Sequence, residues 1–215
     1  MSKLTFVSIL ITLLGVVIYS CDNSSKEEGS GEETELEETK KTPLTLDDYQ
    51  DLGDSIVMST QQALLMELKT AMDSFGAPGA VEYCNLNALN IVQTQMEAFD
   101  VSIKRSSLKV RNPLDAPKEN EKIVLEEWQF MHDQRDDLIP FAEYLADNRV
   151  AYYSPIFLGA PLCQNCHGNP ASDITPETLA KIDELYPQDE ATGYDLGDFR
   201  GIWIVEFDNV ERVEL

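Results

Sequence analysis

Positive charge is scarce in this chain, which has 16 lysine and arginine residues against 39 aspartate and glutamate residues and a formal net charge of −23. Nucleic-acid binders need clustered cations to displace counterions from phosphates, so the composition argues against that class of partner. It argues equally against docking on anionic lipid headgroups. A basic redox partner fits such a chain through electrostatic steering, although solubility alone accounts for the charge.

Histidine and cysteine are also few, with two and four copies. There is one C-x-x-C sequence, and there is neither a second one nor a pair of histidines beside it. A zinc site with four protein ligands therefore cannot be completed. No internal repeat is present, and 215 residues with 43% apolar side chains suit one domain with flanking segments.

The N-terminal segment is typical of an exported bacterial lipoprotein. Lys3 precedes a nearly unbroken apolar run from Phe6 to Ile18, which is too short for a typical spanning helix but fits a secretory signal. The run leads into IYSC, which resembles a lipobox with Cys21 as the lipidated residue. The alternative is an uncleaved anchor. We expect residues 1–20 to be a lipoprotein signal peptide and the protein to be lipid-anchored on the periplasmic side of a bacterial membrane.

Residues 21–42 differ abruptly in composition, because serine, glycine, glutamate and lysine dominate them. Such a segment cannot bury enough apolar surface to offset the entropy of ordering it. We therefore expect a disordered acidic tether, followed by one folded domain over 43–215.

Hydrophobic periodicity predicts helices early in this domain and strands late, which is an α+β arrangement. The sequence GAPG ends the first helix, and Thr175 followed by Pro176 gives a helix start. The expected helices cover about 46–75, 80–99, 119–134, 138–148 and 176–185. The expected strands cover 101–107, 150–158 with an interruption at Pro155, and 198–208.

The sharpest motif is CQNCH, from Cys163 to His167. C-x-x-C-H is typical of c-type haem attachment. Two thiols at this spacing reach the two vinyl groups of one haem, and the adjacent histidine becomes the proximal iron ligand. The sequence therefore predicts one covalent haem c, attached through Cys163 and Cys166 in a loop with His167 under the iron.

The same motif has other interpretations. A thioredoxin-like redox pair needs a helix N-terminus after a βα unit and gives His167 no role. A disulfide between Cys163 and Cys166 is the plain alternative in an exported protein. Haem attachment is favoured over the redox pair, over the disulfide and over a zinc site.

The sixth iron position is open on this interpretation. Cys84 has no disulfide partner left, but a lone cysteine on an apolar helix face is usually a small buried hydrophobe. The residues alone do not choose among the candidates, which are His132, Met72, Met96, Met131, Cys84 or no side chain.

Four segments resemble, in order, those of the haem-c-bearing, PAS-like bacterial sensor domains first catalogued as a domain of unknown function. They are GAPGAVEYCNLNA, RSSLKVRNPLDAP, SPIFLGAPLCQNCHG and GYDLGDFRGIWIVEF. The resemblance covers about Leu46 to Phe207. It implies an α+β fold with a PAS-like antiparallel sheet and long N-terminal helices. It also implies His167 and Cys84 as the axial pair, and a thiolate ligand would give a low reduction potential.

Three arginines lie in the matching segments, namely Arg105, Arg111 and Arg200. An arginine presents a bidentate fork to a carboxylate, so these residues are candidates for binding the haem propionates. Ordinary ion pairs are an equally good explanation of each one. Asp115 departs from the family, which often has asparagine at this position.

The favoured function is an exported c-type haem protein for redox sensing or electron transfer. Since no signalling module follows the last expected strand, we expect a separate redox or signalling partner. An alternative is NO or CO binding after the Cys84 bond breaks on reduction. A small haem peroxidase or reductase would need a distal acid–base group, and an enzyme is less favoured because His132 lies in a charged stretch. A structural lipoprotein without haem remains the plain alternative.

Overall fold

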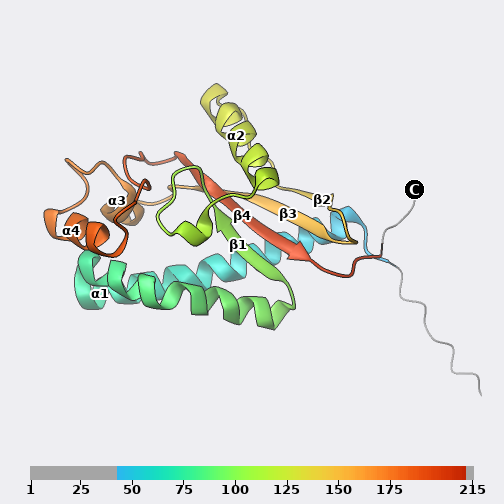
Figure 1. Ribbon diagram of the computed structural model, residues 1–215, viewed down its shortest axis with the longest axis horizontal. Helices are drawn as coiled ribbons and strands as arrows, with labels where there is room; N and C mark the ends of the chain where they lie inside the picture. The colour runs from blue at the N-terminus through green and yellow to red at the C-terminus, as the bar shows by residue number, and fades with distance from the viewer. Residues whose placement is uncertain (1–42, 212–215) are drawn as a thin grey trace, which may run out of the picture. The chain divides into compact units, whose positions relative to one another are not determined.

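The computed structural model describes residues 43–211. The expected signal peptide over 1–20, the lipidation site Cys21 and the expected tether over 21–42 lie outside these residues. Within them the chain is α+β, as expected, with a four-stranded antiparallel sheet and a long N-terminal helical element (Figure 1). Within 43–211 no helix combines the length and the apolar character that crossing a bilayer requires.

The N-terminal element α1 (Leu46–Phe99) is a helical hairpin. Its backbone leaves the helical region at Gly76, where φ is 67° and ψ is −177°, and Pro78 follows. Only glycine adopts such angles without strain. The arms over 46–75 and 77–99 run antiparallel, and the Ser59 hydroxyl donates to Gln95 Oε1 across them at 3.0 Å. The two expected helices are confirmed, and the second begins directly after the reversal.

The sheet has the order β1-β4-β3-β2, and all three pairings are antiparallel. Side chains alternate between its faces along β4, so Trp203 and Val205 pack with α1, while Ile202 and Ile204 pack with α2. Figure 1 shows α1 and α2 on opposite sides of the sheet. The bounds are β1 Ser102–Ser106, β2 Phe141–Tyr144, β3 Val150–Phe157, β4 Phe199–Phe207 and α2 Glu119–Gln134.

The expected helix over 138–148 is wrong, because β2 occupies this region. β2 forms a hairpin with β3, and the turn between them places Asp147 and Asn148 at φ values of 61° and 55°. Phe141 packs its ring 5.1 Å from that of Tyr153. Pairing with the buried strand therefore outweighs the local helical pattern.

The later elements follow the expectations more closely. Thr175 caps α4 (Pro176–Leu185) through its hydroxyl oxygen, which accepts from the Thr178 N–H. The expected interruption at Pro155 is wrong, since β3 continues through it. Pro155 lies beyond the end of β2, where β3 has a neighbour on one side only, and proline is tolerated there.

Candidate functional site

The CQNCH pentapeptide lies on a short helix, α3 (Pro161–His167), rather than in the expected loop. Cys163, Cys166 and His167 occupy positions i, i+3 and i+4, which share one face of a helix. Gly168 ends the helix, and its N–H donates to the Gln164 carbonyl at 3.0 Å. The two thiols and the imidazole therefore project from the same side of α3.

The imidazole of His167 has a defined tautomer. Its Nδ1 lies 2.7 Å from the carbonyl oxygen of Ala191, which can only accept, so Nδ1 carries the proton. Burial lowers the pKa of His167 well below its ordinary value of 6.5, and the cations of Arg111 and Arg200 lower it further. His167 is thus a neutral imidazole whose Nε2 keeps a lone pair that can bind a metal.

A chain segment over 189–194 holds this histidine in place. The Gly193 N–H donates to the carbonyl of Gly168 at 2.8 Å, and the Tyr194 N–H donates to the carbonyl of His167 at 3.0 Å. The Glu190 N–H donates to the carbonyl of Val110 at 2.9 Å, which ties the segment to the loop after β1. The backbone around His167 is therefore fixed from both sides.

Cys84 lies near α3, close enough to Cys166 for the two thiols to interact electrostatically. Val81, one turn before it on α1, packs in a small apolar cluster with which Cys166 is in contact. Burial raises the pKa of Cys84, while the cations of Arg105 and Arg111 act in the opposite direction. Burial also raises the pKa of Cys166 to about 11, with Cys84 among the neighbours that contribute. None of the three described cysteines is paired in a disulfide.

The three arginines converge on the same region from different elements. Arg111 Nη2 donates to the carbonyl of Cys166 at 2.6 Å. Arg200 Nη1 donates to the hydroxyl of Ser107 at 2.5 Å, whereas its buried Nε has no partner among the described residues. The Arg105 guanidinium lies 5.6 Å from the ring centre of Trp203. Burial, and then the neighbouring arginines, lower the pKa of Arg200. Two carboxylates accompany these three cations, because Asp189 pairs with Arg111 and Asp115 lies close to Arg105 and Arg200.

Three of the other candidate ligands lie elsewhere, namely His132, Met131 and Met96. The His132 ring is on α2, where it packs 6.1 Å from that of Phe157 and 6.5 Å from that of Phe199. Met131 packs in the core under α2, and Met96 packs in the core under α1. Residues 43–211 contain no group of three or more histidine, cysteine or acidic side chains arranged to hold a metal ion.

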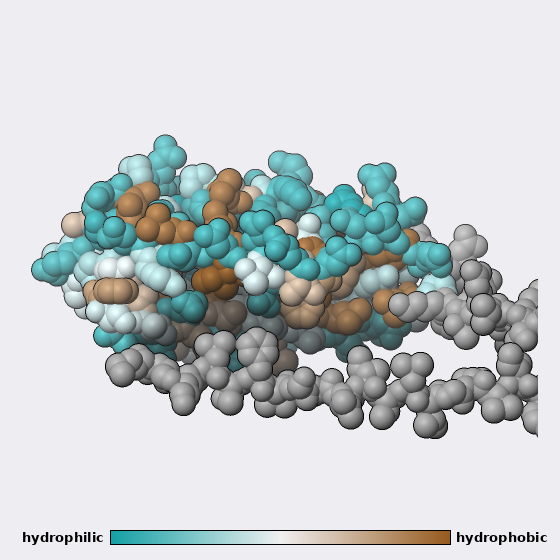
Figure 2. Space-filling view, turned by 90° about the horizontal axis from the view of Figure 1, so that it is seen from below, coloured by the Kyte–Doolittle hydropathy of each residue, from teal (hydrophilic) through white to brown (hydrophobic). Residues whose placement is uncertain are grey.

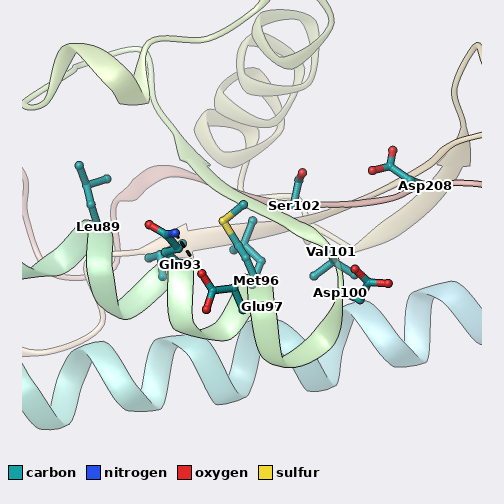
Figure 3. A pocket seen from close by; sticks show the side chains of 10 residues that line it. Leu89, Gln93, Met96, Glu97, Asp100, Val101, Ser102 and Asp208 are labelled. Atoms are coloured by element: carbon teal, nitrogen blue, oxygen red, sulfur yellow. Dashed lines mark hydrogen bonds between the residues drawn. The ribbon is translucent and has the colours of Figure 1, made fainter.

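Two surface grooves lie away from the pentapeptide. The first, of about 600 Å³, runs between the second arm of α1 and β1, and Figure 3 shows Leu89, Met96 and Glu97 at its wall. The second, of about 750 Å³, follows the first arm of α1 around Met58 and Met66. Seen from the α1 side, apolar residues are scattered among hydrophilic ones (Figure 2). Neither groove is lined by a residue of α3.

Sequence reasoning missed two participants, Asp189 and the carbonyl group of Ala191. Asp189 accepts from Arg111 Nε at 2.8 Å, and Ala191 accepts from His167. A backbone carbonyl has no sequence signal, and aspartate is one of many acidic residues here. Only the fold brings both to the pentapeptide.

Comparisons with known proteins agree with this architecture. Residues 31–207 match the Tll0287-like family. The fold is similar to the crystal structure of the cyanobacterial heme-protein Tll0287, with a TM-score of 0.58 and 20% sequence identity over 79% of this chain and 100% of that one. No curated protein matches. The match to the family model spans most of the chain, and the chain therefore belongs to the Tll0287-like family.

Proposed function

We propose that this protein binds one c-type haem through thioether bonds to Cys163 and Cys166, with His167 and Cys84 as its axial ligands. The observation that carries the proposal is the shared face of α3, from which both thiols and a neutral imidazole project. Thioether attachment needs two thiols at this spacing next to the histidine. The similarity to a cyanobacterial heme-protein supports the same cofactor.

The chemistry of the surrounding residues fits such a group. His167 Nε2 makes no hydrogen bond within 43–211, and the Nδ1–H bond to Ala191 orients the ring and makes it a better donor. Cys84 would supply a soft thiolate from α1. The buried, unpartnered Nε of Arg200 is a donor of the kind that pairs with a propionate carboxylate, and Arg105 adds positive charge beside it. Arg111 is already paired with Asp189.

We further propose that the protein serves in redox sensing or electron transfer. A haem with these ligands would exchange one electron without substrate chemistry. The chain's task is then to hold the imidazole neutral, keep the thiolate close and neutralise the propionates. The net charge of −23 favours a basic partner protein, and the IYSC sequence favours lipid anchoring on the periplasmic side of a bacterial membrane.

The proposal is tested by expressing the full chain in cells that attach haem c. A pyridine haemochrome spectrum and the intact mass should show one covalent haem on the wild type and none on the double variant Cys163→Ala/Cys166→Ala. Colourless wild-type protein would contradict the proposal and favour a structural lipoprotein. A change in the Soret band of the reduced protein on adding CO would indicate gas binding, and turnover of peroxide or nitrite would indicate an enzyme.

A further inference from the structure

The Asp189 carboxylate uses both oxygen atoms to hold its surroundings. Oδ1 accepts from Arg111 Nε at 2.8 Å and from the Ala191 N–H at 3.2 Å, and Oδ2 accepts from Arg111 Nη2 at 3.2 Å. Only 6% of the Asp189 side chain and 14% of the Arg111 side chain are exposed. The pair is therefore bidentate and largely shielded from solvent.

Both partners of this carboxylate reach the pentapeptide. Arg111 Nη2 donates to the Cys166 carbonyl at 2.6 Å, and that carbonyl belongs to the last turn of α3, where helix carbonyls lack intrahelical partners. Ala191 accepts the Nδ1–H of His167 at 2.7 Å through its carbonyl. Two hydrogen-bonded routes thus run from one carboxylate to the proposed iron-binding helix.

We infer that Asp189 is a positioning residue that fixes the orientation of His167 and balances the positive charge beside it; this inference rests on the proposed haem function. Asp189 is not one of the proposed haem ligands, and its printed partners are Arg111 and the Ala191 N–H. It acts through the Ala191 carbonyl, which orients the imidazole, and through Arg111, whose charge it neutralises. Groups beyond the ligands commonly tune a metal in this way.

The sign of the expected effect follows from charge. Asp189→Asn keeps the shape of the side chain but leaves the Arg111 cation without its counter-charge, so the reduced iron is favoured and the reduction potential rises. Arg111→Gln leaves the Asp189 anion alone, so the potential falls. The double variant removes both charges and should lie between the two single variants. A purely structural role would not produce shifts of opposite sign.

The experiment is a potentiometric titration of the haem-loaded full chain. We expect each single variant to change the ferric-to-ferrous ratio at a fixed ambient potential by about tenfold, which for one electron corresponds to about 59 mV. Asp195→Asn is the matched control, because Asp195 is an exposed aspartate in the same loop region, and it should leave the potential unchanged. Should Asp189→Asn fail to fold, the comparison of Arg111→Gln with the double variant still measures the effect of the Asp189 charge, because these two proteins differ only at residue 189.

A second measurement separates this inference from the haem proposal. In chain produced without haem attachment, the ¹⁵N shifts of the His167 ring should report the Nδ1–H tautomer in the wild type and a mixture in Asp189→Asn. Wild-type protein without haem would overturn the proposed function, while the tautomer result still tests Asp189. Unchanged potentials in both single variants, or an unchanged tautomer in Asp189→Asn, would overturn the role of Asp189.

Discussion

Gly53 of α1 lies directly against the aromatic ring of Tyr152 of β3, so that a Cβ atom at residue 53 would stand 2.2 Å from the ring carbon Cγ. Tyr152 is fully buried, and its hydroxyl donates to Asp54, the residue that follows Gly53. The ring cannot move without breaking this bond. The contact sets how closely the helical hairpin approaches the sheet.

Gly53→Ala should therefore lower the free energy of unfolding by about 1–3 kcal/mol, because overpacking outweighs the better helix propensity of alanine. Urea unfolding followed by circular dichroism measures the change. Asp51→Ala, at an exposed position on the same helix, is the control and should change stability little. A Gly53→Ala variant as stable as the wild type would mean that Tyr152 has room to shift.

An ion pair between a buried glutamate and a partly exposed lysine (26% exposed) joins α2 to β1. Glu121 is 1% exposed, and its Oε2 accepts from Lys104 Nζ at 2.6 Å. Lys104→Met should lower the free energy of unfolding by about 3–5 kcal/mol, because the Glu121 carboxylate would stay buried with Lys118 Nζ at 3.8 Å as its nearest cation. Denaturant unfolding at pH 7 measures this loss.

The matched control for Lys104 is Lys69, which pairs with Asp73 at 3.1 Å while both side chains are about 70% exposed. Lys69→Met should cost at most about 1 kcal/mol. The double variant Lys104→Met/Glu121→Leu should recover part of the loss, since it removes the stranded charge. Equal losses for Lys104→Met and Lys69→Met would contradict the buried-glutamate interpretation.

Local signals account for the parts of the fold that the sequence predicted well. Thr175 before Pro176 starts a helix by chemistry contained in neighbouring residues, and so does the Thr45–Asp48 capping box at the start of α1. The sequence did not predict β2, because Phe141 is held in this strand by the rings of Tyr153 and Trp128, which lie 12 and 13 residues away in the sequence. The Asp147-Asn148 pair was the one local sign of its hairpin.

In the candidate site, too, the sequence predicted the local features and missed the long-range ones. The spacing of Cys163, Cys166 and His167 is local, so the sequence alone indicated their chemistry. Asp189 and the Ala191 carbonyl act on His167 across more than twenty residues, and no spacing rule connects them. Sequence therefore predicts ligand types, while the groups that orient the ligands come from the tertiary fold.

Thiol reactivity in the haem-free chain should reveal the burial of Cys166. Burial raises its pKa from an ordinary 9.0 to about 11, and the thiolate is the reactive form. At pH 8 about one Cys166 side chain in a thousand is then a thiolate, and alkylation by iodoacetamide should accelerate about tenfold per pH unit up to pH 10. Mass spectrometry of timed samples measures this rate.

The control for this profile is the same chain in concentrated urea, where the Cys166 pKa should return to its ordinary value and the rate should level off near pH 9. Alkylation of the folded chain should be slower than that of the unfolded chain, because a raised pKa reduces the thiolate fraction at every pH below it. A folded-state profile that levels off near pH 9 would contradict the buried environment of Cys166.

The proposed sixth iron ligand, Cys84, and the alternative ligand His132 lie on different elements, so substitutions can distinguish between them. Cys84 lies on α1 close to Cys166, whereas His132 lies on α2 against Phe157 and Phe199. Cys84→Ala should abolish the low-spin ferric spectrum of the haem-loaded protein and raise its reduction potential, because a thiolate stabilises ferric iron. His132→Ala should leave both unchanged. Electron paramagnetic resonance and optical titration measure these properties, and low-spin bands that persist in Cys84→Ala but vanish in His132→Ala would reverse the assignment.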